Sequence, residues 1–209
     1  MMKTDFILVG GGGHALSLLE SLPESLSVIG YAALSPSQNI KLEWLGNDAT
    51  DTTILSLPHP FHIAFIYAGT PLMDKRREII SRYEKAGARF VTIIAPSAIV
   101  TPNSVIGEGS AILAGAIVNR ASLGRHVVVN TGAIVEHDCE IGDNTFIGPG
   151  AVLGGGVRIG NDCFIGLGAR IRNGITIGPG VTVGMGAIVT RDLSEPGIYH
   201  GFPLRHHPI

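Results

Sequence analysis

The stretch that decides the fold lies in the second half of the chain, where residues 135–159 read VEHDCEIGDNTFIGPGAVLGGGVRI. Within it every sixth residue from Val135 onward is aliphatic, and the residue four places after each is small or β-branched. The aliphatic series extends in both directions through Leu123, Val129, Val135, Ile141, Ile147, Leu153, Ile159, Ile165, Ile171, Ile177, Val183 and Val189. A fixed period of six residues is typical of a parallel β-helix, in which each hexad is a short strand plus a turn. We therefore predict that three hexads form one triangular coil whose interior is filled by the aliphatic side chains.

Coils of three hexads place residues 18 apart directly above one another, so the sequence alone predicts which residues are neighbours in adjacent coils. Upstream the period continues from Ile94 to Val118, and one residue is missing between Val118 and Leu123, so the phase slips once. Glycines that follow the aliphatic positions, such as Gly142 and Gly148, are expected to supply backbone freedom at the bends.

The same spacing separates core residues from surface residues. Cys139 and Cys163 fall at the cramped inward position, so we interpret both as core residues rather than nucleophiles. They lie 24 residues apart, on different faces, and are not expected to pair. Flat faces that carry Ile117, Ile134 and Val152 favour self-association, most simply as a closed homotrimer.

Composition limits the classes of partner. The 209 residues carry a net charge of −2, and only 15% of them are charged, which argues against nucleic acid or an acidic membrane surface. The apolar run at residues 6–9 is far shorter than a signal-peptide core, and no stretch approaches the length of a membrane span. Two cysteines form no disulfide framework, so a cytoplasmic location is expected.

Glycine and lysine divide the chain into two parts. Eight of the 29 glycines lie in residues 1–94 and 21 in the remainder, whereas all lysines precede residue 95. We therefore predict two domains, residues 1–94 and residues 95–209. In the first, strands are expected at residues 5–9, 28–31, 63–68 and 90–94, and helices at residues 16–22 and 73–86. Alternation of strands and helices predicts a small parallel α/β sheet.

The first strand runs into a glycine-rich loop, in which Gly10, Gly12 and Ala15 match the dinucleotide-binding spacing. That fingerprint also requires an acid after the second strand, where this chain has Ala32 and Ala33, so NAD is rejected. Two alternatives stay open for the loop: a site for a pyrophosphate or another anion, and a tight turn without a ligand.

The chemistry centres on His137, which lies two places after an inward residue and is flanked by Glu136 and Asp138. A neighbouring carboxylate can orient an imidazole and raise its basicity. The 18-residue spacing places Gly155 in the same column, where a bare backbone N–H could stabilise an oxyanion. The alternative is a solvated surface histidine.

A metal centre is a further alternative for the histidines of the repeat. Three histidine ligands with an open fourth position would be required, and within the repeats only His126 and His137 are present. No metal is therefore expected.

Three segments resemble the NeuD/PglD-type sugar acyltransferases: GGGGHA at residues 10–15, NTGAIVEHDCEIGD at residues 130–143, and GFP at residues 201–203. The resemblance implies a small Rossmann-like domain followed by a left-handed β-helix, assembled as a trimer. It also implies that acetyl-CoA lies in the groove between adjacent β-helices.

The resemblance further implies roles for single residues. His137 would be the general base, with Asp138 raising its basicity, and the sugar would attack acetyl-CoA directly without an acyl-enzyme. The acyl-CoA site would comprise Phe146, Gly155, Leu167 and Met185. Gly12, Gly13 and His14 would hold the nucleotide-sugar. The chain departs from the family pattern in two places: Phe146 replaces a frequent histidine, and Ala32 and Ala33 replace an acidic pair.

The leading hypothesis is N-acetylation of an amino group on a nucleotide-linked amino-deoxy sugar. An O-acetyltransferase that acts on sialic acid or a related sugar is the second hypothesis. A non-catalytic β-helix that binds a sugar is the third. Neither the nucleotide nor the length of the acyl chain follows from these residues.

Overall fold

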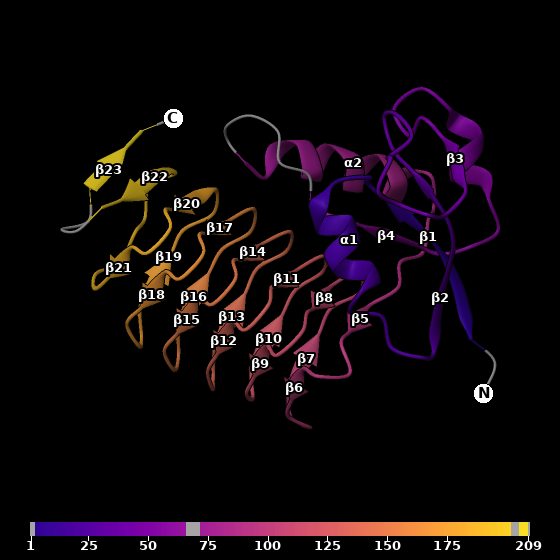
Figure 1. Cartoon of the computed structure of the whole chain (residues 1–209). Coiled ribbons are helices and arrows are strands. Elements are labelled where there is room, and N and C mark those ends of the chain that lie inside the picture. The colour runs from indigo at the N-terminus through magenta and orange to yellow at the C-terminus, as the bar shows by residue number, and fades with distance from the viewer. Residues whose placement is uncertain (1–2, 66–71, 202–204, 209) are drawn as a thin grey trace.

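The computed structural model describes residues 3–65, 72–201 and 205–208. It comprises a small α/β domain followed by a long three-sided β-helix, with the chain ending in a two-stranded hairpin (Figure 1). In the described part of the chain no helix is long and apolar enough to span a bilayer.

The N-terminal domain is a parallel sheet with a helix on each face. Its strands are β1 (Thr4–Val9), β2 (Leu26–Ala32), β3 (Trp44–Gly46) and β4 (Phe61–Ile63), in the order β3-β2-β1-β4. Successive side chains of a strand point to opposite faces. Phe6 and Leu8 therefore pack in the cluster with helix α1 (Gly13–Leu19), and Ile7 and Val9 pack in the cluster with α2 (Asp74–Lys85).

Most of the expected elements of this domain are present, with shifted ends. The strands at residues 5–9 and 28–31 and the helix at residues 73–86 are confirmed as β1, β2 and α2. The first helix begins three residues earlier than residues 16–22 and ends at Leu19. Strand β3 and the 3₁₀-helix Thr52–Ser56 were not predicted.

Two predicted strands are shorter than expected. The strand at residues 63–68 is β4, which ends at Ile63; residues 66–68 of that prediction lie outside the described part. The strand at residues 90–94 is reduced to Ile93 and Ile94, which pair with the β-helix, and Phe90 forms a single bridge with Phe61.

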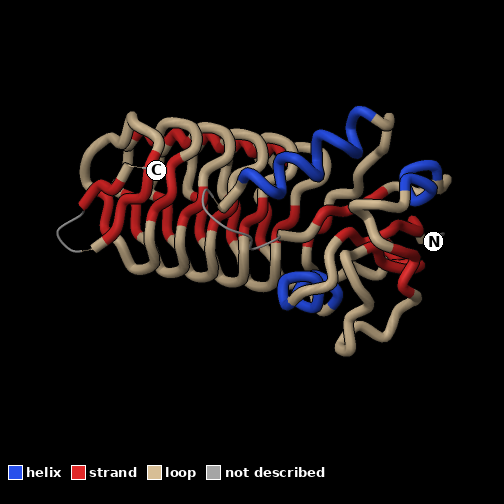
Figure 2. The backbone as a smooth tube through the Cα atoms, turned by 90° about the horizontal axis from the view of Figure 1, so that it is seen from above, coloured by secondary structure: helices blue, strands red, loops and turns tan. Residues whose placement is uncertain are grey.

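The β-helix strands are β5 (Ile93–Ile94), β6 (Ile99–Val100), β7 (Val105–Ile106), β8 (Ala111–Ile112), β9 (Ile117–Val118), β10 (Ser122–Leu123), β11 (Val128–Val129), β12 (Ile134–Val135), β13 (Glu140–Ile141), β14 (Phe146–Ile147), β15 (Val152–Leu153), β16 (Arg158–Ile159), β17 (Phe164–Ile165), β18 (Arg170–Ile171), β19 (Thr176–Ile177), β20 (Val181–Val183) and β21 (Ile188–Val189). They form three sheets. The first has eight strands, from β5 to β20 and including the hairpin β22 (Gly197–His200) and β23 (Arg205–His207). The second has six strands, from β6 to β21, and the third has five, from β7 to β19. Figure 2 shows the successive coils stacked along one axis.

The pairing register confirms the stacking rule. Ile134 pairs with Val152 and Phe146 with Phe164, each 18 residues further on, whereas Ile117 pairs with Ile134, only 17 residues away. The shorter step spans the position of the missing residue, so the phase slip predicted there is real and costs the coil one turn residue.

Three long edges join the sheets, and each is a column of two-residue turns. The leucine edge, from the eight- to the six-stranded sheet, comprises residues 131–132, 149–150, 167–168 and 185–186. The histidine edge, from the six- to the five-stranded sheet, comprises Arg120, where the missing residue shortens the turn, and residues 137–138, 155–156 and 173–174. The domain edge, from the five- to the eight-stranded sheet, comprises residues 125–126, 143–144, 161–162 and 179–180.

The glycines of the repeat serve a purpose that differs from the predicted one. The left-handed backbone lies at the second turn residue, for example Gly150 (φ 64°) and Gly168 (φ 64°), and not at the glycine after each aliphatic position. At Gly142 an added Cβ would lie 2.6 Å from the backbone nitrogen of Asn161, and at Gly166 it would lie 2.6 Å from that of Met185. These glycines therefore permit close approach of adjacent coils, and the expectation of conformational freedom there is wrong.

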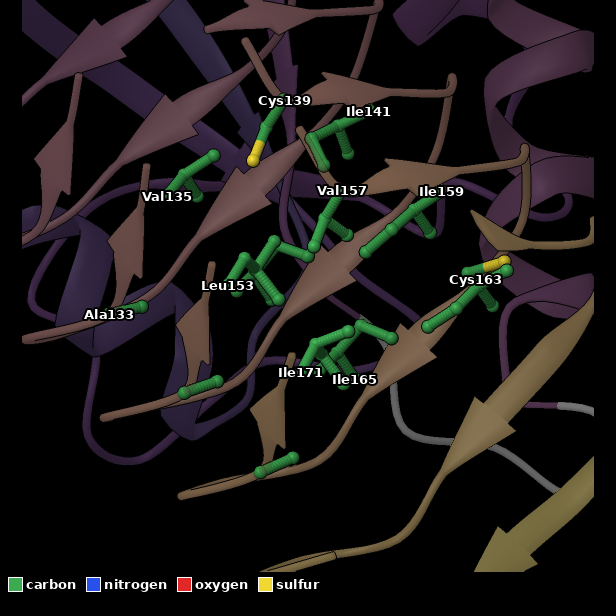
Figure 3. Close-up of a cluster of buried hydrophobic side chains, with 14 of the residues drawn as sticks. Ala133, Val135, Cys139, Ile141, Leu153, Val157, Ile159, Cys163, Ile165 and Ile171 are labelled. Carbon is green, nitrogen blue, oxygen red and sulfur yellow. The ribbon is translucent and has the colours of Figure 1, made fainter. Parts of the chain in front are cut away.

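The interior of the β-helix is one continuous apolar cluster (Figure 3). Cys139 and Cys163 lie within it, as free thiols 1% and 0% exposed. Burial raises the pKa of the Cys163 thiol to about 12, and the Cys139 thiol donates to the carbonyl oxygen of Gly154 (3.3 Å). The interpretation of both cysteines as core residues is confirmed.

The N-terminal domain lies against the outer surface of the eight-stranded sheet. Ala15 and Leu18 of α1 share a buried cluster with Ala111 and Leu113 around β8. Further along the same sheet, Met73 packs against Val128, Phe146 and Phe164. One cleft, lined by residues of both parts, arises from this packing.

Candidate active site

His137 projects from the histidine edge with one ring nitrogen held by a carboxylate. Its Nδ1 lies 2.8 Å from Oδ2 of Asp138, and both side chains are more than half exposed. The hydrogen bond from His137 lowers the pKa of Asp138, which is therefore a carboxylate that can only accept. In the neutral ring the proton therefore resides on Nδ1, and the lone pair of Nε2 is free to act as a base.

The backbone explains this arrangement. Asp138 occupies the second turn position, where φ is +61°, a left-handed conformation that Asp tolerates better than most residues. Glu136, the other flanking carboxylate, accepts from the His137 backbone N–H (3.2 Å) and from Nδ2 of Asn119 (3.0 Å). Of the two predicted carboxylate neighbours, only Asp138 therefore orients the ring.

Gly155 lies directly against the imidazole, as the 18-residue spacing predicts. A Cβ added at Gly155 would lie 2.7 Å from both Cε1 and Nε2 of His137. In the described part of the chain no group accepts a hydrogen bond from the Gly155 N–H. Pro149 and Pro179 occupy the equivalent turn position on the other edges, so the fold does not need a donor there. A free donor beside a base is thus available to a ligand.

The leucine edge presents apolar side chains instead. Leu167 and Met185 occupy equivalent turn positions in adjacent coils, and they are 55% and 74% exposed. The predicted column of these two residues is present, but it lies on a different edge from His137 and Gly155. One chain therefore does not bring the four residues together.

A cleft of about 420 Å³ adjoins the leucine edge where the N-terminal domain meets the eight-stranded sheet. It is lined by His14, Ser17, Phe65, Asn130, Thr131, Phe146, Pro149, Phe164 and Leu167. The ring of Phe146 stacks on Phe164 (5.0 Å between centroids, 1° between planes) and lies 4.3 Å from that of Phe65. We call this space the aromatic cleft. It contains Phe146, Leu167 and His14 of the predicted site, but not Gly155 or Met185.

A second cleft, of about 520 Å³, surrounds the glycine-rich loop and is called the glycine cleft. It is lined by residues 10–14, 33–37, 48–49, 65, 75, 79 and 82. An added Cβ would meet nothing within 4 Å at Gly12 or Gly13, whereas at Gly10 it would lie 3.0 Å from Cβ of Ala64. Packing therefore accounts for Gly10 but not for Gly12 and Gly13, whose bare backbone borders open space.

Two cations on α2, Lys75 and Arg82, line the same cleft as the glycine-rich loop. Arg82 pairs with Asp48 (2.9 Å), and Lys75 pairs with Glu78 (3.1 Å) at the surface. Ala33, which stands where the dinucleotide-binding fingerprint requires an acid, also lines this cleft. The sequence does not mark either cation as a site residue. Charged residues on a helix usually form its solvated face, and no local pattern indicates that these two line the same cleft as the glycine-rich loop.

His14 lines both clefts. Its Nδ1 accepts a hydrogen bond from the backbone N–H of Phe65 (2.9 Å), so the neutral ring carries its proton on Nε2. Burial, followed by the charge of Arg76, lowers the pKa of His14 to about 3. Nε2 is buried and has no partner among the described residues, so it is a donor without an acceptor. Buried donors of this kind point to a ligand or water.

No group of three metal-ligating side chains is found in residues 3–65, 72–201 and 205–208. His126, one of the two histidines considered for a metal, is buried on the domain edge and lies 3.6 Å from Glu84. Burial lowers its pKa to about 3. The absence of a metal stays a prediction.

The described site could be read from the sequence only in part. Phe164 follows from adding 18 to Phe146, but Phe65 lies in the other domain and is out of reach of any repeat rule. Asn130 immediately precedes the leucine edge and Thr131 is the first residue of that edge, but no spacing rule marks either of them as a lining residue.

Coiled hexads with an exposed, carboxylate-oriented histidine at one edge define a hexapeptide-repeat acyltransferase. Residues 120–155 match the family "Bacterial transferase hexapeptide (six repeats)", and residues 156–191 match "Hexapeptide repeat of succinyl-transferase". The enzyme class and the fold, an α/β domain followed by a left-handed β-helix, are confirmed.

Solved structures narrow the class. PerB from Caulobacter crescentus, in complex with CoA and GDP-perosamine, is 32% identical, with 97% of each chain covered and a TM-score of 0.86. The acetyltransferase domain of PglB from Neisseria gonorrhoeae FA1090, in complex with acetyl coenzyme A, is 29% identical over 98% of this chain and 100% of that one, with a TM-score of 0.87. A histidine-to-alanine variant of GDP-perosamine N-acetyltransferase from Caulobacter crescentus is 30% identical over 98% and 97%, also with a TM-score of 0.87. The chain belongs to the sugar acetyltransferases of this superfamily.

Proposed function

We propose that the protein transfers the acetyl group of acetyl-CoA to the amino group of a nucleotide-linked amino-deoxy sugar. The observation that carries this proposal is that His137 Nε2 and the Gly155 N–H lie side by side on one edge and that neither has a hydrogen-bond partner among the described residues. Two relatives support the substrates: one structure holds CoA with GDP-perosamine, and another holds acetyl coenzyme A.

In the proposed mechanism the neutral amine of the sugar attacks the thioester carbon directly. As the new C–N bond forms, His137 Nε2 accepts the proton that the nitrogen loses, and Asp138 stabilises the resulting imidazolium. The oxyanion of the tetrahedral intermediate accepts a hydrogen bond from the Gly155 N–H. When the C–S bond breaks, the imidazolium returns the proton to the CoA thiolate, and no acyl-enzyme forms.

The two clefts suit a nucleotide-sugar that crosses His14. The diphosphate would lie beside Gly12 and Gly13, opposite Lys75 and Arg82, and accept a hydrogen bond from Nε2 of His14. The sugar would then enter the aromatic cleft, whose rings pack on its C–H faces while Asn130 and Thr131 supply polar contacts.

The active site is proposed to form between copies of the chain. Outward residues of the six-stranded sheet form one apolar column, interrupted only by Arg170: Ile99, Ile117, Ile134, Val152, Arg170 and Ile188. The corresponding column of the five-stranded sheet is mostly polar: Val105, Ser122, Glu140, Arg158 and Thr176. Burial of the apolar face favours self-association, most simply as a closed homotrimer.

The geometry of the prism gives this assembly a functional consequence. The six-stranded sheet is bounded by the histidine edge on one side and the leucine edge on the other. A closed ring that buries this sheet brings the histidine edge of one copy to the leucine edge of the next. His137 and Gly155 would then face the neighbour's aromatic cleft, and the pantetheine arm of acetyl-CoA would pass Leu167, Met185 and the ring of Phe146.

The proposed roles of the two domains follow from this arrangement. We propose residues 1–94 as the domain that binds the nucleotide-sugar and residues 95–209 as the acyltransferase domain. The expectations of a cytoplasmic enzyme, with no nucleic-acid partner and no membrane partner, belong to the same proposal.

Release of free CoA thiol, measured with acetyl-CoA and a panel of acceptors, tests the function. The panel comprises GDP-, UDP- and dTDP-linked 4-amino-6-deoxy sugars, together with sialic acid. Turnover of an amino sugar that is lost in His137→Ala supports the proposal. Turnover of sialic acid alone would establish the O-acetyltransferase instead, and binding without turnover of any acceptor would make the protein a sugar-binding β-helix.

A further inference from the structure

Arg76 is a fully buried arginine on α2 that no step of the proposed reaction uses. It is 0% exposed, and among the described residues no carboxylate accepts a hydrogen bond from it. A buried charge without an ion pair is expensive unless its donors are satisfied. Its position therefore calls for a reason beyond helix formation.

The guanidinium spans the two domains through four acceptors. On the β-helix side Nη1 donates to the carbonyl oxygen of His126 (2.7 Å) and to Oδ1 of Asn144 (2.7 Å), both on the domain edge. On the other side Nη2 donates to the carbonyl oxygen of Ile63 (3.0 Å), and Nε donates to that of Ala64 (3.4 Å). The planar fork of arginine matches such a set of oxygens, whereas a lysine ammonium does not.

The Ala64 carbonyl belongs to the same peptide group as the Phe65 N–H. A trans peptide is planar, with its C=O and N–H directed to opposite sides. The oxygen of this peptide accepts from Arg76, and its N–H donates to Nδ1 of His14 (2.9 Å). Arg76, the peptide and His14 therefore form one chain of hydrogen bonds, in which each bond polarises the next.

We infer that Arg76 is a positioning residue for substrate binding, because it orients the Ala64–Phe65 peptide and thereby fixes the rotation and tautomer of His14. The Phe65 N–H requires a lone pair on Nδ1, so the proton is held on Nε2, which lacks an acceptor among the described residues. The role rests on the proposed function, in which Nε2–H donates to the nucleotide-sugar. The positive charge of Arg76 also contributes to the lowered pKa of His14, so the ring stays neutral.

Steady-state kinetics of Arg76→Lys tests the inference. We expect the KM for the nucleotide-sugar to rise about tenfold, while the KM for acetyl-CoA changes less than about twofold. In a His14→Ala background the same substitution should add less than about twofold, since coupled residues are not additive. Additive effects, or equal losses for both substrates, would show that Arg76 is only a structural cross-link.

Arg77→Ala is the matched control, because Arg77 is the next residue of α2 and also crosses to the β-helix, through Asp162 (3.1 Å). Its hydrogen bonds and ion pairs among the described residues go to Asp74 and Asp162, and none goes to β4 or His14, so both KM values should stay at the wild-type level. An equal rise of the nucleotide-sugar KM in Arg77→Ala would overturn the inference.

Ring ¹⁵N chemical shifts of His14 in the wild-type protein provide a measurement that needs no folded variant. They should report a neutral ring protonated on Nε2 at pH 7, and an Nδ1-protonated or charged ring would refute the inference. If His14→Ala leaves the nucleotide-sugar KM unchanged, the proposed substrate site fails instead, and comparison of the ring shifts in the wild-type and Arg76→Lys proteins then decides whether Arg76 controls His14.

Discussion

The histidine edge and the leucine edge are built from the same turn, yet they present opposite chemistry. At the first turn position the histidine edge carries His137 and Gly155, whereas the leucine edge carries Leu167 and Met185. The repeat dictates the backbone of both edges. The core does not constrain the first turn position, so the residue type there differs: it makes one edge reactive and gives the other an apolar surface. Neither edge is a complete site, and both border the six-stranded sheet.

Replacement of His137 by alanine breaks the histidine edge most directly. We expect kcat to fall by about 10³-fold, because a general base contributes roughly 10²–10⁴ to the rate. The melting temperature should stay at the wild-type value, since the side chain is 58% exposed. Asn173→Ala, at the same turn position of the same edge, is the control and should retain full activity. A His137→Ala enzyme with near-wild-type kcat would remove the edge from the mechanism.

Gly155→Ala tests the close approach on that edge. The new Cβ would lie 2.7 Å from the His137 ring, so the imidazole must move and kcat should fall by about 10²-fold. Gly174→Ala has nothing within 4 Å but a φ of +71°, so it should lower stability by about 1 kcal/mol without lowering kcat. Kinetics and thermal unfolding of both variants separate the two effects. Equal kcat values would mean that Gly155 serves only the backbone.

A charge on the leucine edge should act on acetyl-CoA rather than on the chemical step. Leu167→Asp is expected to raise the KM for acetyl-CoA about tenfold, because it places a carboxylate where an apolar arm would pack, with kcat changed less than threefold. Val105→Asp introduces the same charge at a position of similar exposure, 61%, on the five-stranded sheet and should leave KM unchanged. A Leu167→Asp variant with wild-type KM would exclude this edge from the acetyl-CoA site.

The β-helix and the N-terminal domain differ in how far the sequence predicts them. Stacking depends on a period that is local along the chain, so the hexads alone placed Gly155 beside His137. The aromatic cleft depends on Phe65 approaching Phe146 from another domain, and the Arg76 contacts depend on the same docking. No spacing rule spans such a contact, because its geometry is set by the packing of whole elements.

The wrong expectation for the repeat glycines has a similar origin. A glycine at a bend suggests an unusual φ, but Gly142 and Gly166 are required by a neighbouring coil that comes within van der Waals contact. Only the distance between coils, and not the local pattern, reveals that cause.

Mixing two damaged enzymes sharpens the comparison of the edges, since the proposed site takes one edge from each of two copies. In trimers reassembled from equal amounts of His137→Ala and Leu167→Asp chains, every mixed trimer contains one interface with both edges intact. About three quarters of the trimers are mixed, so about one quarter of all sites should be restored. At low acetyl-CoA the mixture should therefore reach about a quarter of the wild-type rate, roughly fivefold above the mean of the two parents. A rate equal to that mean would contradict a site shared between two copies. His137 and Leu167 lie on different edges of one chain, so a different assembly would then have to bring these edges together.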